Sequence, residues 1–462
     1  MMPDEQGILS KSQYFANRIS SSAKKNENVV VVGHHDADGV CGASLLADYV
    51  FRLGGHCEIK FISEPNVRFL EKLASGKFDM VLFVDVGSGL SSEISRILGD
   101  RWLVIDHHEI PEEEMESDHI LNPWQFAYDG GTDVSASGLC YFVCEKNRSS
   151  RASFVAISGG LADMQDTGPR RSLVGLNAKI LSEDSRIESK VDILLFGRET
   201  RPAHESLASS IECYIPGLTS NKDACLASMR GAGVDLKLSS RWKTIADFTD
   251  EEKHQLLTAI VPHLAGTTNT VEDLVGTVYT TSSEDEFSPM RDARDFATIL
   301  TCCGRMGKPA LGFSLCVGDG GPIQTECDKV LADYRVELVK AVQTLTSSAD
   351  RVLEGRGYSL VVADGIVSER MTGAVCQVLA SLNRSKTKAV FLRTTTQEGD
   401  VKVSARLGKE AGERDLGRML REIGRSTSGV GGGHRNRAGV RFSIIKQQEF
   451  QAAVDSQFQT KK

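Results

Sequence analysis

Residues 28–39 read Asn-Val-Val-Val-Val-Gly-His-His-Asp-Ala-Asp-Gly. Four consecutive valines that end at a glycine predict a buried β-strand followed by a turn. The next segment, 40–53, has the apolar spacing of a helix. In open parallel sheets ligands bind beyond the carboxyl ends of the strands. This stretch therefore predicts an α/β fold and places polar chemistry at the end of its first strand.

The same alternation of short apolar runs and helical patterns continues to about residue 166. Strands separated by helical stretches of about 10–15 residues indicate right-handed βαβ units and a parallel sheet. Further strands of this sheet are predicted at 57–62, 79–85 and 101–106, with a helix from about residue 91.

The pattern changes beyond residue 169. Residues 170–288 are predicted to form a largely helical insert or connector, and the Thr- and Ser-containing stretch 266–288 is interpreted as its boundary. Strands and helices then mix again, which predicts a second, smaller α/β domain. The final residues are polar, and we expect them to fray. The predicted division is 1–169, 170–288, 289–446 and a polar tail at 447–462.

The composition is that of a globular protein. The chain has 462 residues, which at roughly 100–200 residues per domain predicts two or three domains. We expect a cytoplasmic location, because no stretch reaches the roughly 18 apolar residues of a membrane helix and the N-terminus lacks the features of a signal peptide. The net charge of −8 argues against a protein that coats nucleic acid and favours binding confined to a local channel.

Eleven cysteines are present, an odd number without any C-x-x-C pair. This argues against a full disulfide framework and against a zinc knuckle. We therefore predict reduced and mostly buried thiols.

Aspartates and histidines follow the predicted strands. They occur at 33–39, at Asp85, at 106–108, and at Asp163 after the glycines at 159–160. One aspartate at a strand end is usually a helix cap or a turn residue. The combination is more informative, since five of the ten histidines (His34, His35, His107, His108 and His434) fall within a few short motifs. Two divalent cations can activate water and neutralise a phosphodiester, and a set of Asp and His without Cys favours Mn²⁺ or Mg²⁺ over structural zinc.

These motifs resemble those of a known superfamily. Asp36-Ala-Asp38-Gly39, Asp85, Asp106-His107-His108 and Asp163 resemble the four motifs of the DHH phosphoesterases, and residues 431–439 resemble the signature of the DHHA1 domain. Residues 160–165 and 196–202 are similar to the archaeal RecJ-like group, which includes the GINS-associated nuclease. The resemblance implies a parallel-sheet DHH domain with a helical insert, followed by a smaller DHHA1 domain.

The resemblance also implies roles for individual residues. His108 would contact the scissile phosphate, and Asp106 would orient an adjacent histidine. Asp85 would bridge the two cations, Mn²⁺ or Mg²⁺. His34 is either a ligand or a phosphate contact. The implied metal set is His34, Asp36, Asp38, Asp85, His107 and Asp163.

Candidate substrate contacts lie elsewhere. Ser135 and Ser137 precede a predicted helix at 139–146, and they either hold a phosphate or only cap that helix. Arg305 and Arg406 are candidates for phosphate contacts. In the predicted DHHA1 domain, Gly432, Gly433 and His434 would approach the nucleic acid closely.

The resemblance implies a metal-dependent exonuclease that releases nucleoside monophosphates from single-stranded DNA or RNA during replication or repair. GINS and the replicative helicase would be its partners. Two alternatives remain open. One is a structural component of that helicase complex with incidental activity, and the other is a phosphodiesterase for cyclic dinucleotides or short oligonucleotides.

Overall fold

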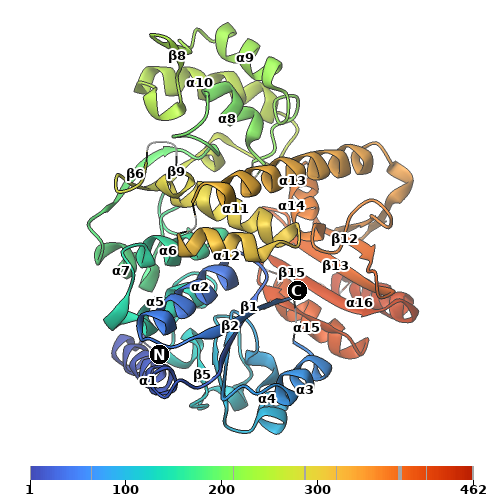
Figure 1. Cartoon of the computed structure of the whole chain (residues 1–462). Coiled ribbons are helices and arrows are strands. Elements are labelled where there is room, and N and C mark those ends of the chain that lie inside the picture. Colours follow the sequence, from blue (N-terminus) through green and yellow to red (C-terminus); the bar gives the residue numbers. More distant parts are fainter. Residues whose placement is uncertain are drawn as a thin grey trace. The chain divides into compact units, whose positions relative to one another are not determined.

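The computed structural model describes residues 2–459, except 64, 212, 286–287, 319, 383–387 and 413. The chain divides into two compact units. The first comprises residues 1–194 and 275–331, and the second comprises 195–274 and 332–462. Figure 1 shows the helices and strands named below. Each unit has its own sheet and core, so each is described by itself.

A parallel sheet of five strands forms the centre of the first unit, in the order β2-β1-β3-β4-β5. The predicted strands are therefore confirmed, with small shifts at their ends. The strands are β1 (Val29–His34), β2 (Cys57–Ile62), β3 (Met80–Val84), β4 (Trp102–Ile105) and β5 (Ile120–Leu121).

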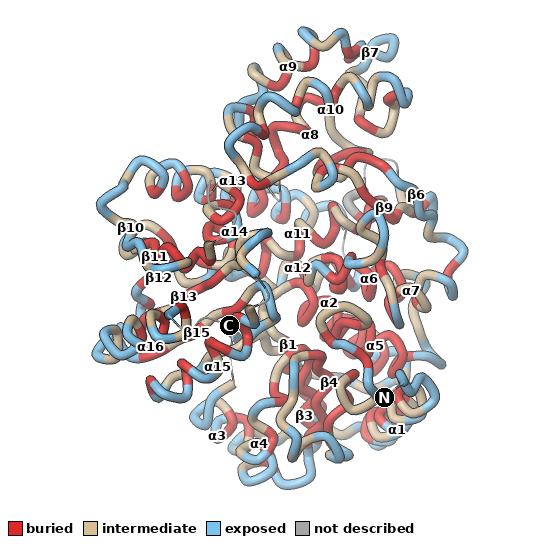
Figure 2. The backbone as a smooth tube through the Cα atoms, turned by 180° about the vertical axis from the view of Figure 1, so that it is seen from behind, coloured by how far each residue is buried: buried red, intermediate tan, exposed pale blue. Residues whose placement is uncertain are grey.

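Helices cover both faces of this sheet. Leu70 and Leu73 of α3 (Val67–Ser75), with Ile94 of α4 (Ser91–Leu98), pack on one face against alternate strand residues. The helices α2 (Ala37–Arg52) and α5 (Ala136–Val143) lie on the other face, where Gly42 of α2 allows close packing against Val84 and Cys140. Strands covered on both sides are continuously apolar rather than alternating, which explains the run of four valines. Figure 2 shows the central strands as buried.

The first unit also contains an antiparallel ribbon that the sequence did not predict. The strands β6 (Ile187–Ile193) and β9 (Val275–Thr281) pair over their full length, although the whole stretch 170–288 was predicted as largely helical. Most side chains of β6 are exposed, so the strand lacks the apolar alternation by which sequence patterns are recognised. Further helices of the unit are α1 (Glu5–Lys24), α6 (Ala152–Ala162), α7 (Gly175–Ser182), α11 (Ala293–Arg305) and α12 (Pro309–Val317).

The second unit begins with the mostly helical segment 195–274. It contains α8 (Ala203–Ser209), α9 (Lys222–Gly231) and α10 (Asp250–Leu264), with a short hairpin between the last two. The long helix α13 (Pro322–Thr346) starts in the first unit and ends in the second.

A mixed sheet of six strands follows, in the order β10-β11-β12-β13-β15-β14. One face packs against α15 (Leu416–Ser426) and α16 (Gln447–Gln459), and Ser404 of β13 contacts α14 (Thr372–Leu382) on the other. The fold class predicted from the sequence is confirmed. The strands are β10 (Val352–Gly355), β11 (Tyr358–Val362), β12 (Ala389–Thr395), β13 (Asp400–Leu407), β14 (Val430–His434) and β15 (Arg437–Ser443).

The end of the chain differs from its prediction as a polar tail. Residues 447–459 form the helix α16, which buries Phe450, Val454 and Phe458 in the core of the six-stranded sheet. These three apolar residues recur at four-residue spacing and so share one helix face. Residues 460–462 of the predicted tail lie outside the described part of the chain.

Nine of the eleven cysteines are buried, as predicted. Over the described ranges, no helix combines the length and the apolar character needed to cross a membrane.

Candidate metal centre

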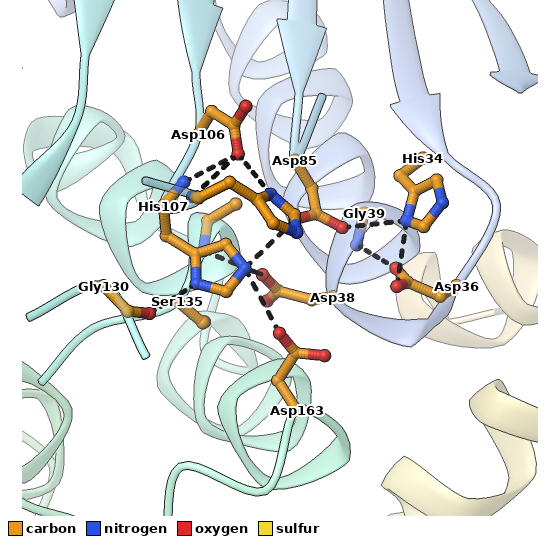
Figure 3. Close-up of polar contacts among 12 residues, drawn as sticks. His34, Asp36, Asp38, Gly39, Asp85, Asp106, His107, Gly130, Ser135 and Asp163 are labelled. Carbon is orange, nitrogen blue, oxygen red and sulfur yellow. Dashed lines mark hydrogen bonds and ion pairs between the residues drawn. The ribbon is translucent and has the colours of Figure 1, made fainter. Parts of the chain in front are cut away.

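Side chains from three strand ends and one helix end meet in the first unit (Figure 3). His34 ends β1, Asp85 follows β3, and Asp106 to His108 follow β4. Asp163 is the residue at which α6 ends. Ligand atoms of these side chains form three groups, each lying within 4.8 Å. The convergence expected from a parallel sheet is therefore found.

One group contains His34, Asp36 and Asp85. His34 Nδ1 lies 2.9 Å from Asp36 Oδ2 and 3.2 Å from Asp85 Oδ2. Asp36 is also the N-cap of α2, and its Oδ1 accepts a hydrogen bond of 3.1 Å from Gly39 N. The capping interpretation of this aspartate and its position in the cluster are thus compatible.

A second group contains Asp38, His107 and Asp163. His107 Nε2 lies 3.2 Å from Asp163 Oδ2 and 3.9 Å from Asp38 Oδ2. Both Asp38 and His107 are fully buried. Three polar groups that come from positions 38, 107 and 163 thus share one small volume.

Asp85 belongs to both sides of the cluster. Its Oδ2 faces His34, whereas its Oδ1 lies 3.3 Å from His107 Nε2. The backbone of Asp85 has φ 61°, in the left-handed region that few residues other than glycine, asparagine and aspartate adopt. A carboxylate with one oxygen toward each group has the arrangement needed to bridge two cations.

Asp38 is held by the N-terminus of α5. Its oxygens accept hydrogen bonds from Ala136 N (2.8 Å), Ser137 N (3.1 Å) and Ser137 Oγ (2.5 Å). Ser135 caps the same helix through a bond of 3.2 Å from Gly138 N. Both serines are fully buried. Of the two interpretations of Ser135 and Ser137, the structure favours capping, since this helix N-terminus binds a carboxylate of the protein itself.

Asp106 lies behind the two histidines that follow it. It accepts hydrogen bonds from the backbone N of His107 (2.8 Å) and of His108 (3.2 Å). Its Oδ1 also lies 2.8 Å from His108 Nδ1. The His108 side chain is 42% exposed, in contrast to the buried His107. Asp106 thus contacts both the backbone and the ring of His108.

The carboxylates perturb each other and the imidazoles. Burial and the nearby charge of Asp85 raise the pKa of Asp38 to about 7. Burial and the charge of Asp36 raise the pKa of Asp85. Burial alone would lower the pKa of His107, but Asp163 and Asp85 raise it well above its usual value. Without a cation, protons on the imidazoles would have to balance the crowded negative charge.

The residues fit divalent cations better than protons. Asp85 Oδ1 is buried and accepts no hydrogen bond from the described residues. The set offers carboxylate oxygens and imidazole nitrogens without a cysteine, which suits Mn²⁺ or Mg²⁺. Such ions would supply the positive charge that the cluster lacks.

The other predicted substrate contacts are placed as follows. Arg305 is the last residue of α11 in the first unit. Arg406 of β13 donates to Gln377 Oε1 (2.9 Å) and Gly373 O (3.1 Å), which indicates a structural role within the second unit. Gly432, Gly433 and His434 lie on β14, an edge strand of the six-stranded sheet.

Two residues at the centre were missed from the sequence. Gly130 O lies 2.6 Å from His107 Nδ1, and Gln165 Nε2 donates to the same oxygen over 2.9 Å. Gln165 stands inside one of the quoted motifs, which was a usable signal. Gly130 lies in an Asp-Gly-Gly segment that reads as an ordinary turn.

Three family models match this chain. The N-terminal domain model of the DHH family matches residues 28–164. The DHH-CID domain matches residues 195–275, and the DHHA1 domain matches residues 357–460. Together the three matches cover most of the chain, and they follow one another along the sequence without overlap.

Individual proteins are similar to this chain over most of its length. The uncharacterized protein MJ0831 of Methanocaldococcus jannaschii is 27% identical over 438 residues, 92% of this chain and 92% of that protein. CDC45 of Entamoeba histolytica superposes with a TM-score of 0.64 at 12% identity, covering 98% of this chain and 99% of that one. RecJ of Thermus thermophilus in complex with Mn²⁺ gives a TM-score of 0.58 at 15% identity, covering 97% of this chain and 55% of RecJ. At these identities the two solved structures establish a shared fold only.

Proposed function

This chain belongs to the RecJ-like DHH/DHHA1 superfamily, and from that premise we propose that it is a metal-dependent exonuclease acting on single-stranded nucleic acid. It would hydrolyse phosphodiester bonds and release nucleoside monophosphates during DNA replication or repair. The observation that carries the proposal is a pair of adjacent Asp/His groups with Asp85 between them: Asp85 belongs to the group of His34 and Asp36, and its Oδ1 lies 3.3 Å from His107 Nε2 of the other group.

The roles proposed for the ligands follow from the two groups. His34 and Asp36 would hold one cation, Asp38, His107 and Asp163 the other, and Asp85 both. Bound cations would supply the Lewis acidity that activates a water molecule and neutralises charge on the phosphate. The relative in complex with Mn²⁺ supports this choice of metal, as does the absence of cysteine from the set.

His108 is the proposed contact to the scissile phosphate. Its Nδ1 faces Asp106, so its Nε2 points away from that carboxylate and can donate to a phosphate oxygen. Asp106 lies behind it and holds its orientation. Removing either side chain should therefore lower the rate of hydrolysis more than it lowers metal affinity.

We assign the binding of nucleic acid mainly to the second unit, because its β-strand β14 is rich in glycine. In the α15–β14 packing, a Cβ added to Gly417 would lie 2.4 Å from Gly433 O, so helix and strand are in close contact. The residues of this unit proposed to contact the nucleic acid are Gly432, Gly433 and His434. Arg305 is the proposed contact from the first unit.

The test is digestion of end-labelled single strands of DNA and RNA with Mn²⁺ or Mg²⁺. Asp85→Asn should reduce the rate at least about 100-fold, because it removes the shared carboxylate while keeping a side chain that tolerates positive φ. Asp48→Asn is the matched control: Asp48 lies on α2 in a surface ion pair with Arg52. Undiminished hydrolysis by the Asp85 variant would sink the proposal.

A structural role in a replication complex is the second candidate. It is favoured by the likeness to CDC45, which spans nearly the full length of both chains. The expected partners would be GINS and the replicative helicase. Stable association with them, together with no turnover of any strand, cyclic dinucleotide or short oligonucleotide, would favour this candidate over the nuclease.

A further inference from the structure

Gln165 is a fully buried glutamine close to the metal centre. It follows α6, two residues after Asp163, and none of its side chain is exposed. Its Nε2 donates to Gly130 O over 2.9 Å, and its Oε1 accepts from Asn177 Nδ2 over 2.6 Å. Both ends of the amide are therefore bonded inside the protein.

The carbonyl of Gly130 links this amide to His107. His107 Nδ1 lies 2.6 Å from Gly130 O (Figure 3). A carbonyl oxygen only accepts hydrogen bonds, so Nδ1 carries the hydrogen. The other nitrogen, Nε2, then presents its lone pair toward Asp85 and Asp163 when the ring is neutral. This is the tautomer in which Nε2 can bind a metal.

Gly130 O can only accept, so it requires the Nε2 end of the Gln165 amide, and Asn177 binds the other end. Asn177 lies in the first turn of α7 (Gly175–Ser182), and its backbone N is bonded to Asp133 O. If the Gln165 amide turned over, two oxygens would meet at Gly130 and two NH₂ groups would meet at Asn177. The orientation with Nε2 toward Gly130 is thus the one that satisfies both partners.

A merely space-filling role does not explain this arrangement. Burying an amide costs free energy unless its hydrogen bonds are made, and an apolar side chain of similar size avoids that cost. Here the amide donates to the oxygen that also accepts from His107. The hydrogen bonds therefore converge on a group next to the metal centre.

We propose that Gln165, hydrogen-bonded to Asn177, is a positioning residue that holds the Gly130 carbonyl and thereby fixes the tautomer and ring orientation of His107 for a divalent cation. This inference rests on the proposed metal-dependent function. Partners of this kind behind a ligating histidine typically contribute about 10-fold to 100-fold in metal affinity.

The test is a direct titration of the full chain with Mn²⁺, in which free Mn²⁺ is followed by its electron paramagnetic resonance signal. Gln165→Met keeps the length of the side chain and removes both hydrogen bonds. It should weaken binding at the His107 side by about 10-fold or more. In the Mg²⁺ form, ¹⁵N–¹H NMR should show that the Nδ1–H signal of His107 is shifted or lost in this variant.

Ser158→Ala is the matched control, because it removes a buried hydrogen bond of 2.7 Å to Phe154 O on the same helix α6 without reaching His107. It should leave Mn²⁺ affinity and the His107 signal unchanged. If Gln165→Met fails to fold, Asn177→Ala tests the same contact from its other end and should weaken Mn²⁺ binding in the same direction.

Wild-type affinity in a folded Gln165 or Asn177 variant would overturn the inference, whatever the activity. An equal loss in Ser158→Ala would also overturn it, since any damage to α6 would then suffice. Failure of the nuclease proposal looks different: the wild type would bind Mn²⁺, the Gln165 variant would bind it more weakly, and neither would cleave any strand.

Discussion

Gly39 shows how closely single residues are fitted at the metal centre. It lies in the first turn of α2, where alanine would normally be the better helix former. A Cβ at this position would lie 2.5 Å from His34 O and 2.7 Å from His34 N. The backbone of β1 and the start of α2 therefore touch at the point that orients His34 and Asp36.

Gly39→Ala is expected to displace His34 and to lower the proposed nuclease activity by about 100-fold, the usual effect of a displacement of about 1 Å in a catalytic group. Gly231→Ala is the control, since nothing lies within 4 Å of a Cβ added to that helical glycine. The control should keep full activity and gain up to about 1 kcal/mol of stability. Steady-state kinetics and urea unfolding of both variants check this, and equal activities would contradict it.

The raised pKa of Asp38 predicts how metal-free stability depends on pH. A carboxyl whose pKa rises from 3.8 to about 7 on folding costs stability when it ionises. That cost is absent below about pH 4, grows as the pH rises and is complete above about pH 7. In EDTA the protein should thus be less stable at about pH 8 than at about pH 5, by on the order of a few kcal/mol.

Urea unfolding at the two pH values measures this difference. It should shrink in Asp85→Asn, because the Asp85 charge contributes to the raised pKa of Asp38. It should also shrink when Mn²⁺ is added in place of EDTA. If the wild-type protein in EDTA is more stable at about pH 8 than at about pH 5, the prediction is wrong.

The residues that meet in the cluster could be predicted one by one, because each stands in a short motif at the end of an apolar run. Asp38 and His107 are examples: both follow predicted strands. Gln165 stood in a quoted motif, but its role and that of Gly130 could not be predicted, because they depend on which backbone oxygen lies beside which ring in the folded chain. The sequence pattern carries no such information.

At the scale of elements, the buried parallel strands were predictable because their apolar runs are short and end at turn residues, which distinguishes them from buried helices. The ribbon β6–β9 was missed because β6 exposes most of its side chains and so lacks the apolar alternation of a half-buried strand. β14 was missed as a strand because it contains three glycines, which are rare in strands. In both cases pairing with a neighbouring strand overrides weak local preference.

The helix α16 gives a prediction at this scale. Phe450 is buried and its ring stacks on Phe442, with 4.7 Å between the ring centroids. Phe450→Ala should therefore lower the free energy of unfolding by about 3–5 kcal/mol. Gln459→Ala, at an exposed position of the same helix, should change it by less than about 0.5 kcal/mol. Urea unfolding measures both, and a negligible loss for Phe450→Ala would mean that this helix frays.

At the scale of the whole molecule, the division into two compact units predicts that metal binding stabilises the first unit and leaves the second unchanged. Mn²⁺ is expected to slow hydrogen exchange in α2, α5 and α6, which hold the proposed ligands or their partners. Exchange in α16 should not change, because it packs in the core of the second unit. Hydrogen–deuterium exchange with mass spectrometry, with and without EDTA, checks this. Equal slowing in both units would contradict it.

The contacts of Asp38 bear on how this family can evolve. The same carboxylate that faces the centre also holds the start of α5 through two backbone amides and one hydroxyl. Mutations that abolish cleavage are therefore not equally tolerable. In relatives that no longer catalyse a reaction but keep the fold, we expect Asp163 or His34 to be substituted first. Asp38 should be retained, because its hydrogen bonds stabilise the start of α5. Comparing the sequences of inactive relatives at these positions would show whether Asp38 is retained where Asp163 and His34 are substituted.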